Sequence, residues 1–154
     1  MSLDEVIFAE ENGVGIITLN RPERLNAITH PMVEKINHHL NIWEKKDDIK
    51  CVIIEGAGDR SFCAGGDVVK LRKEVLEAGG PPTNLSRSFF YDEYTLNYKI
   101  SNYNKPFIAL INGFTMGGGV GISMHGSHVV ASEKTMFAMP ETAIGLFPDV
   151  GGGW

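Results

Sequence analysis

Apolar and polar residues alternate over two short stretches near the start of the chain. Residues 5–10 and 14–19 show this alternation on either side of Asn12-Gly13. Alternation around an Asn-Gly pair predicts a β-hairpin. The next segment has a helical period instead, and Pro31 suits its first turn. Its apolar positions are Val33, Ile36, Leu40 and Trp43.

Short apolar runs and helical patterns then follow each other along the chain. We expect strands at 51–55, 107–111, 128–131 and 135–138, and helices at 68–76, 89–101 and 117–124. Residues 61–67 are expected to form a loop of small residues, and Gly-Gly-Pro-Pro at 79–82 is expected to break the chain in a mobile segment. This alternation predicts an α/β domain built from repeated strand-strand-helix units.

The composition is that of one ordinary globular domain. The 154 residues are 43% apolar and 21% charged, with a net charge of −5 at pH 7. A nucleic-acid-binding surface would be basic, so no nucleic-acid partner is expected. No segment resembles a signal peptide or approaches the roughly 20 apolar residues of a membrane span. We therefore expect no membrane partner and a cytoplasmic location.

The cysteines and histidines give little reason to expect reactive or metal chemistry. Cys63 has no visible basic partner that would activate a thiol, which favours a structural role. The pairs His38-His39 and His125…His128 lack a cluster of carboxylates or thiolates around them. We expect no metal site.

Two glycine loops carry a stronger signal. Residues 63–67 and 117–119 each follow a buried strand, so both loops can lie at the carboxyl ends of strands, where α/β sheets bind ligands. One backbone N–H from each loop would form an oxyanion hole, in which one donor contributes about 3–4 kcal/mol to catalysis. The alternative is that the glycines only permit close packing. The pairing of two such loops favours a functional site.

Three carboxylates stand in apolar surroundings. Glu141 follows Pro140, and Asp149 follows Phe147-Pro148. Glu93 lies among aromatic residues of the predicted helix at 89–101. An ionised carboxylate is costly to bury unless it is paired or used in chemistry. A helix cap or a contact to a backbone amide is the alternative for Glu141 and Asp149, and a solvated helix face is the alternative for Glu93.

Several segments resemble the crotonase (enoyl-CoA hydratase/isomerase) superfamily along nearly the whole chain. They are residues 20–27, 61–67, 105–113, 115–121 and 137–152. Within the superfamily, the last two are similar to the branch that hydrolyses 3-hydroxyisobutyryl-CoA. The resemblance implies an α/β fold, a crotonase-like spiral of ββα units. It also implies that residues 1–154 are the N-terminal part of the core domain, truncated before the C-terminal helices that close the pocket.

The resemblance also implies roles for individual residues. The N–H groups of Gly66 and Gly118 would hold the thioester carbonyl. Coenzyme A would be held by Arg24, Ala64, Gly66 and Asp67, and it would be part of the substrate, so no separate cofactor is expected. A homo-oligomer is allowed for the longer protein. A mitochondrial matrix location is implied if the source is eukaryotic and a presequence has been removed.

The resemblance implies the reaction as well. Glu141 would act as nucleophile or as general base. Asp149 would hold the substrate's 3-hydroxyl or orient water, and Glu93 and Gly118 would contact the substrate. Hydratases of the superfamily use a second glutamate at the position of Gly121, and glycine there argues for thioester hydrolysis, as in valine degradation, over hydration.

Two alternatives to this hydrolase remain open. One is an enoyl-CoA hydratase or isomerase. The other is a non-catalytic module that binds CoA thioesters or macromolecules, including the RNA-binding role of some relatives. The 154-residue piece can lack activity in isolation, because a half-open pocket cannot exclude water.

Overall fold

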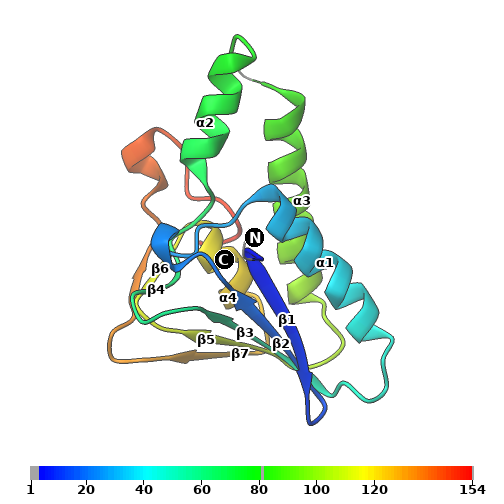
Figure 1. The fold of residues 1–154 in the computed structure, drawn as a ribbon. Coiled ribbons are helices and arrows are strands. Elements are labelled where there is room, and N and C mark those ends of the chain that lie inside the picture. Colours follow the sequence, from blue (N-terminus) through cyan, green and yellow to red (C-terminus); the bar gives the residue numbers. More distant parts are fainter. Residues whose placement is uncertain (1–3, 81, 154) are drawn as a thin grey trace.

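The computed structural model describes residues 4–80 and 82–153, and it contains two sheets covered by helices (Figure 1). The larger sheet has the strand order β1-β2-β3-β5-β7, and the smaller one has the order β4-β6-β8. The strands are β1 (Val6–Glu11), β2 (Val14–Leu19), β3 (Cys51–Gly56), β4 (Ser61–Cys63), β5 (Phe107–Ile111), β6 (Phe114–Met116), β7 (His128–Ala131) and β8 (Met136–Ala138). The helices are α1 (His30–Glu44), α2 (Val68–Glu77), α3 (Asn84–Ser101) and α4 (Gly118–Met124), with 3-10 turns η1 (Pro22–Arg24) and η2 (Glu141–Ile144).

The expected strand-strand-helix repeat is present. Strands β1 and β2 form the predicted antiparallel hairpin. Each later pair of consecutive strands divides between the sheets: β3, β5 and β7 enter the larger sheet, and β4, β6 and β8 enter the smaller one, all in parallel. A helical segment follows each pair. The loops that follow β4, β6 and β8 therefore meet at one end of the smaller sheet.

Helices α1 and α3 pack against each other beside the larger sheet, and α2 projects away from it (Figure 1). Helix α1 begins with Pro31 in its first turn, as the sequence predicts. It buries one face on the sheet, and this face comprises Met32, Val33, Ile36, Leu40 and Trp43. Burial of such a face contributes about 1.5–3 kcal/mol for each large apolar side chain. The core fixes the position of β4 and β6, the strands that precede the glycine loops.

Two predictions about local structure were wrong. Residues 61–63 form strand β4 rather than part of a loop, because Phe62 is buried in the core and the strand pairs with β6. Helix α3 begins at Asn84, five positions before the predicted start at 89, because Thr83 and Ser86 form a reciprocal capping box. The predicted break at 79–82 separates α2 from α3, and Pro81 within it lies outside the described residues.

Candidate active site

The two glycine loops lie in contact. Strands β4 and β6 pair in parallel, so the loops that follow them are neighbours. A Cβ atom placed on Gly65 would lie 3.3 Å from the carbonyl oxygen of Met116 and 3.7 Å from the nitrogen of Gly118. A Cβ placed on Gly118 would lie 3.3 Å from the nitrogen of Gly66. Side chains at these positions would crowd the facing loop, and Gly65 also has φ 107°, which favours glycine.

The backbone of the second loop requires glycine and leaves donors free. Gly117 has φ 50° and ψ −122°, a combination that residues with a side chain avoid. Gly118 is the first residue of α4, and its N–H has no acceptor within the helix. In the first loop, the N–H of Gly66 likewise donates to no acceptor among the described residues. Two unpaired donors therefore lie close together, as the predicted oxyanion hole requires.

Glutamates from two other elements flank these donors. Oε1 of Glu93, on α3, contacts the side of Gly118 on which a Cβ would stand. Oε1 of Glu141, at the start of η2, lies 2.8 Å from the corresponding point on Gly117. The two side chains belong to residues that are only 2% and 6% exposed. The structure thus brings together four of the residues that the sequence singled out.

A cavity of about 260 Å³ joins these groups to Asp149. Its polar lining includes the two glutamates, Asp149 and the glycine loops, and its apolar walls come from α2, α3 and η2. The apolar and small residues of the lining are Ala64, Gly65, Val68, Leu71, Phe89, Phe90, Pro140, Ala143, Ile144 and Leu146. The cavity combines apolar walls with convergent polar groups, which is typical of a small-molecule site.

The electrostatics of the cavity are those of crowded carboxylates. Burial, followed by the negative charges of Asp149 and Glu141, raises the pKa of Glu93 to about 8. Buried oxygens Oε1 of Glu93 and Oε2 of Glu141 have no hydrogen-bond partner among the described residues. Glu93 is consequently protonated at neutral pH.

Asp149 is oriented by α3. The hydroxyl of Tyr94 donates a hydrogen bond of 2.6 Å to Oδ2 of Asp149. Burial and this hydrogen bond both raise the pKa of Tyr94, so the phenol stays protonated. The next residue, Val150, has φ 46°, a strained conformation for a β-branched side chain, and its carbonyl contacts Nε2 of His125 at 2.6 Å. Tyr94 was missed in the sequence, since nothing in it signals a contact to a residue 55 positions away.

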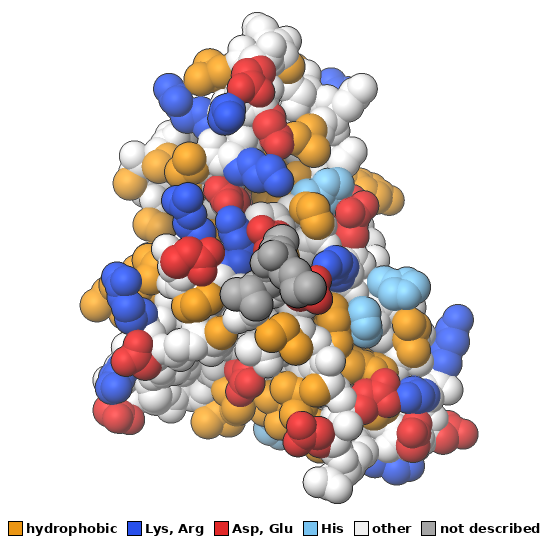
Figure 2. All heavy atoms as spheres, in the orientation of Figure 1, with side chains coloured by type: hydrophobic (Ala, Val, Ile, Leu, Met, Phe, Trp, Pro, Cys, Tyr) orange, Lys and Arg blue, Asp and Glu red, His pale blue; other side chains and the backbone are white. Residues whose placement is uncertain are grey.

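The residues predicted to hold coenzyme A divide between two places. Ala64 lines the cavity of the glutamates, whereas Arg24 and Asp67 line a neighbouring groove of about 410 Å³. Gly66 lines both and marks their junction. The groove also contains Lys70 and Lys73, so it is basic although the chain is acidic. Lys and Arg side chains gather over α2 and η1 in Figure 2.

The two lysines were missed in the sequence. They lie three residues apart and so share one face of α2, but only the fold shows that this face adjoins the glycine loop. The side chain of Asp67 is already engaged. It accepts hydrogen bonds from the N–H of Lys70 and from Nη2 of Arg21. Partial burial raises the pKa of Asp67, but these bonds and the charges of Arg21 and Arg24 outweigh it, and the net shift is downward.

Cys63 has the properties of a structural residue. It is fully buried, and burial raises the pKa of its thiol to about 12. A thiol that stays protonated is a poor nucleophile. The carbonyl oxygen of Cys63 contacts Gly119, where a side chain would clash. The residue therefore supports the packing of α4 on β4.

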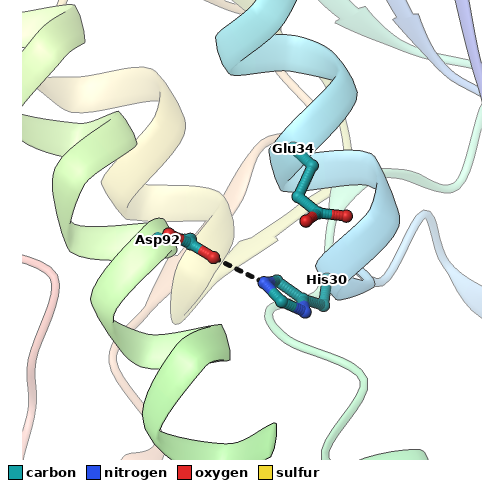
Figure 3. Close-up of side chains that lie close together, drawn as sticks. All are labelled: His30, Glu34 and Asp92. Atoms are coloured by element: carbon teal, nitrogen blue, oxygen red, sulfur yellow. Dashed lines mark hydrogen bonds and ion pairs between the residues drawn. The ribbon is translucent and has the colours of Figure 1, made fainter.

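Figure 3 shows a second polar cluster, formed by His30, Glu34 and Asp92. Nε2 of His30 lies 2.6 Å from Oδ2 of Asp92 and joins α1 to α3. A zinc ion would stand about 2.0–2.2 Å from each ligand atom, which requires a wider separation than 2.6 Å unless the ligands move. As it stands, the cluster is a direct hydrogen bond between two helices. The expectation of no metal stays a prediction.

Comparisons with known proteins identify the family of this chain. Residues 14–154 match the family model described as "Enoyl-CoA hydratase/isomerase". The chain is 55% identical over 150 residues to a protein of Danio rerio named "3-hydroxyisobutyryl-CoA hydrolase, mitochondrial", and 49% identical over 151 residues to the Homo sapiens protein of that name. These matches cover 97% and 98% of this chain but 38% of each relative, so the chain spans well under half the length of these curated relatives.

Solved structures share the fold. A carnitinyl-CoA dehydratase from Mycobacterium thermoresistibile has a TM-score of 0.92 and 43% identity, and the match covers 97% of this chain and 43% of that one. An enoyl-CoA hydratase from Rhodobacter sphaeroides 2.4.1 has a TM-score of 0.91 and 40% identity, with the same coverage. The predicted resemblance and the predicted fold class are confirmed. No helix within residues 4–80 and 82–153 is long and apolar enough to cross a membrane. The chain belongs to the enoyl-CoA hydratase/isomerase family.

Proposed function

We propose that the whole protein hydrolyses a short-chain acyl-CoA thioester, with 3-hydroxyisobutyryl-CoA as the substrate, in a step of valine degradation. The observation that carries this proposal is the convergence of buried Glu141 with the free N–H groups of Gly66 and Gly118. The names of the curated relatives support the choice of substrate. Because those relatives are named mitochondrial, the proposal takes the mitochondrial matrix as the compartment if the source is eukaryotic.

Coenzyme A would occupy the basic groove and pass Gly66 into the cavity of the glutamates. Arg24, Lys70 and Lys73 supply positive charge for its phosphates. The thioester carbonyl would then point at the N–H groups of Gly66 and Gly118. The groove and the cavity share Gly66, so a single extended ligand can reach both.

The chemistry follows from the groups in the cavity. Either Glu141 attacks the carbonyl carbon directly, or it removes a proton from a water molecule that attacks. The carbonyl oxygen becomes negative and is stabilised by the two N–H donors. The C–S bond then breaks, and coenzyme A leaves as its thiol with a proton that comes from water. In the direct route, water next cleaves the anhydride between Glu141 and the acyl group, so by either route the acyl group gains the oxygen of water. The geometry is compatible with both routes.

Asp149 would recognise the 3-hydroxyl of the acyl group. Its carboxylate lines the cavity, and the hydrogen bond from Tyr94 fixes its orientation. A carboxylate accepts a hydrogen bond from an alcohol, and an acyl group without the hydroxyl would lose this bond. The site therefore favours a hydroxylated acyl group.

Hydration or dehydration of an acyl-CoA is the second candidate function. The titles of the two solved structures, a dehydratase and a hydratase, favour it. Glycine at position 121 argues against hydration, because glycine has no side chain that could transfer a proton. A non-catalytic module that binds CoA thioesters or RNA is the third candidate, and buried Glu141 beside unpaired donors speaks against it.

The test is release of thiol from 3-hydroxyisobutyryl-CoA and from isobutyryl-CoA by the full-length protein. We expect fast release from the hydroxylated thioester and slow release from the plain one. Hydration of crotonyl-CoA without thiol release would establish the second candidate instead. If the protein binds CoA thioesters but catalyses neither reaction, the third candidate, a non-catalytic binding module, would be supported.

A further inference from the structure

Glu93 faces the oxyanion hole with a free oxygen. Its Oε1 contacts Gly118 on the side where a Cβ would stand, and the nitrogen of Gly66 lies 3.3 Å from that same point. This oxygen is buried and has no hydrogen-bond partner among the described residues. A buried polar atom without a partner is costly, so such an atom beside two free N–H donors points to a site where a ligand's polar group binds.

Burial, together with the charges around Glu93, raises its pKa. Glu141 faces it from η2 and Asp149 faces it from the segment after η2, and both are acidic. The neighbouring phenol of Tyr94 and the thiol of Cys63 stay neutral because burial raises the pKa of each. Burial and the two carboxylates raise the pKa of Glu93 to about 8. Below that pH, the side chain is a hydrogen-bond donor.

We propose that Glu93 keeps its proton when substrate binds and donates a hydrogen bond to the thioester carbonyl oxygen, as a third donor beside Gly66 and Gly118. This inference rests on the proposed function. An ionised Glu93 at this position would repel the negative oxygen that forms during hydrolysis. A neutral carboxyl group stabilises that oxygen instead, and its proton stays on Glu93 throughout.

A pair of substitutions separates a donor from a carboxylate. Glu93→Gln retains an N–H donor and has no charge, whereas Glu93→Met has a similar length and no donor. We expect the Gln variant to keep kcat within about tenfold of the wild type and the Met variant to lose roughly 100-fold. We also expect wild-type activity to fall as pH rises through about 8, and this fall to be absent in the Gln variant. A Gln variant as inactive as the Met variant would overturn the proposal.

A second measurement does not depend on turnover. In full-length protein with Glu141→Gln, the infrared band of a bound thioester carbonyl, labelled with ¹³C, reports how strongly donors polarise it. We expect a larger shift to low frequency with Glu or Gln at position 93 than with Met. Equal shifts in a protein whose wild type hydrolyses thioesters would overturn the role of Glu93 and leave the proposed function intact. Failure to bind any acyl-CoA would overturn the proposed function, and the role of Glu93 with it.

Discussion

Val150 packs directly against Gly121. The Cβ atom of Val150 lies 2.7 Å from the point that a Cβ on Gly121 would occupy, and Nδ2 of Asn97 lies 2.7 Å from the same point. Val150 adopts φ 46° here and follows Asp149 in the chain. A side chain at position 121 would therefore collide with the segment that carries Asp149.

Enlarging Gly121 should disrupt this segment. We expect Gly121→Ala to lower the free energy of unfolding by about 1–3 kcal/mol, because Val150 and Asn97 must move. Preference for the hydroxylated thioester should fall with it. Ser88→Ala, at an exposed position of α3, is the control. Urea denaturation of the full-length variants measures the effect, and equal stabilities would contradict the packing described here.

Tyr94 should contribute to recognition of the substrate's hydroxyl. Removal of its phenol in Tyr94→Phe takes away the 2.6 Å hydrogen bond to Asp149. A hydrogen bond to a charged group contributes about 1.5–3 kcal/mol when buried, and less at this partly exposed position. We expect KM for 3-hydroxyisobutyryl-CoA to rise roughly three- to tenfold and KM for isobutyryl-CoA to stay unchanged. An equal rise for both substrates would rule out the role in selectivity.

The basic groove should govern affinity for coenzyme A. We expect the double substitution Lys70→Ala and Lys73→Ala to weaken CoA binding about three- to tenfold, and the difference from wild type to shrink at high salt. Lys134→Ala, an exposed lysine outside the groove, is the control. Calorimetric titration with free coenzyme A at two salt concentrations checks this. An unchanged affinity of the double variant for coenzyme A would mean that the phosphates of coenzyme A do not bind in this groove.

The stability of the protein should depend on pH through Glu93. Its pKa is raised from 4.5 to about 8 in the folded state, so the unfolded chain loses this proton first as pH rises. The associated stability is present below pH 4.5 and is lost progressively up to about pH 8. The free energy of unfolding of the wild type should therefore fall over this interval relative to that of Glu93→Gln. Parallel curves for the two proteins would contradict the raised pKa.

Much of the fold could be predicted from the sequence, because the patterns that indicate these helices and strands are local. The Asn12-Gly13 hairpin, the apolar face of α1 and the strand Phe107–Ile111 all have the predicted place. Strands β4 and β6 were missed because each has only three residues, too few to show a period. Their pairing is a long-range contact that only the assembled sheet supplies.

Part of the candidate site could also be predicted from the sequence, and part could not. Gly117, Gly118 and Glu141 could be found because runs of glycine and a glutamate among apolar residues are visible in the chain itself. The partnership of Tyr94 with Asp149 could not, and only the resemblance implied that Glu93 and Gly118 meet at the substrate. These contacts join α3 to distant loops, and no sequence spacing encodes them.

Glu141 is proposed to perform the chemistry beside the oxyanion hole. The most direct measurement is thiol release from 3-hydroxyisobutyryl-CoA by full-length wild type and Glu141→Gln, with coenzyme A affinity measured on both. Gln has nearly the same shape but neither attacks nor accepts a proton as a carboxylate does. We predict that turnover is abolished, by roughly 1,000-fold or more, while coenzyme A affinity stays within about twofold. A variant that keeps a near wild-type kcat would contradict the assignment of Glu141.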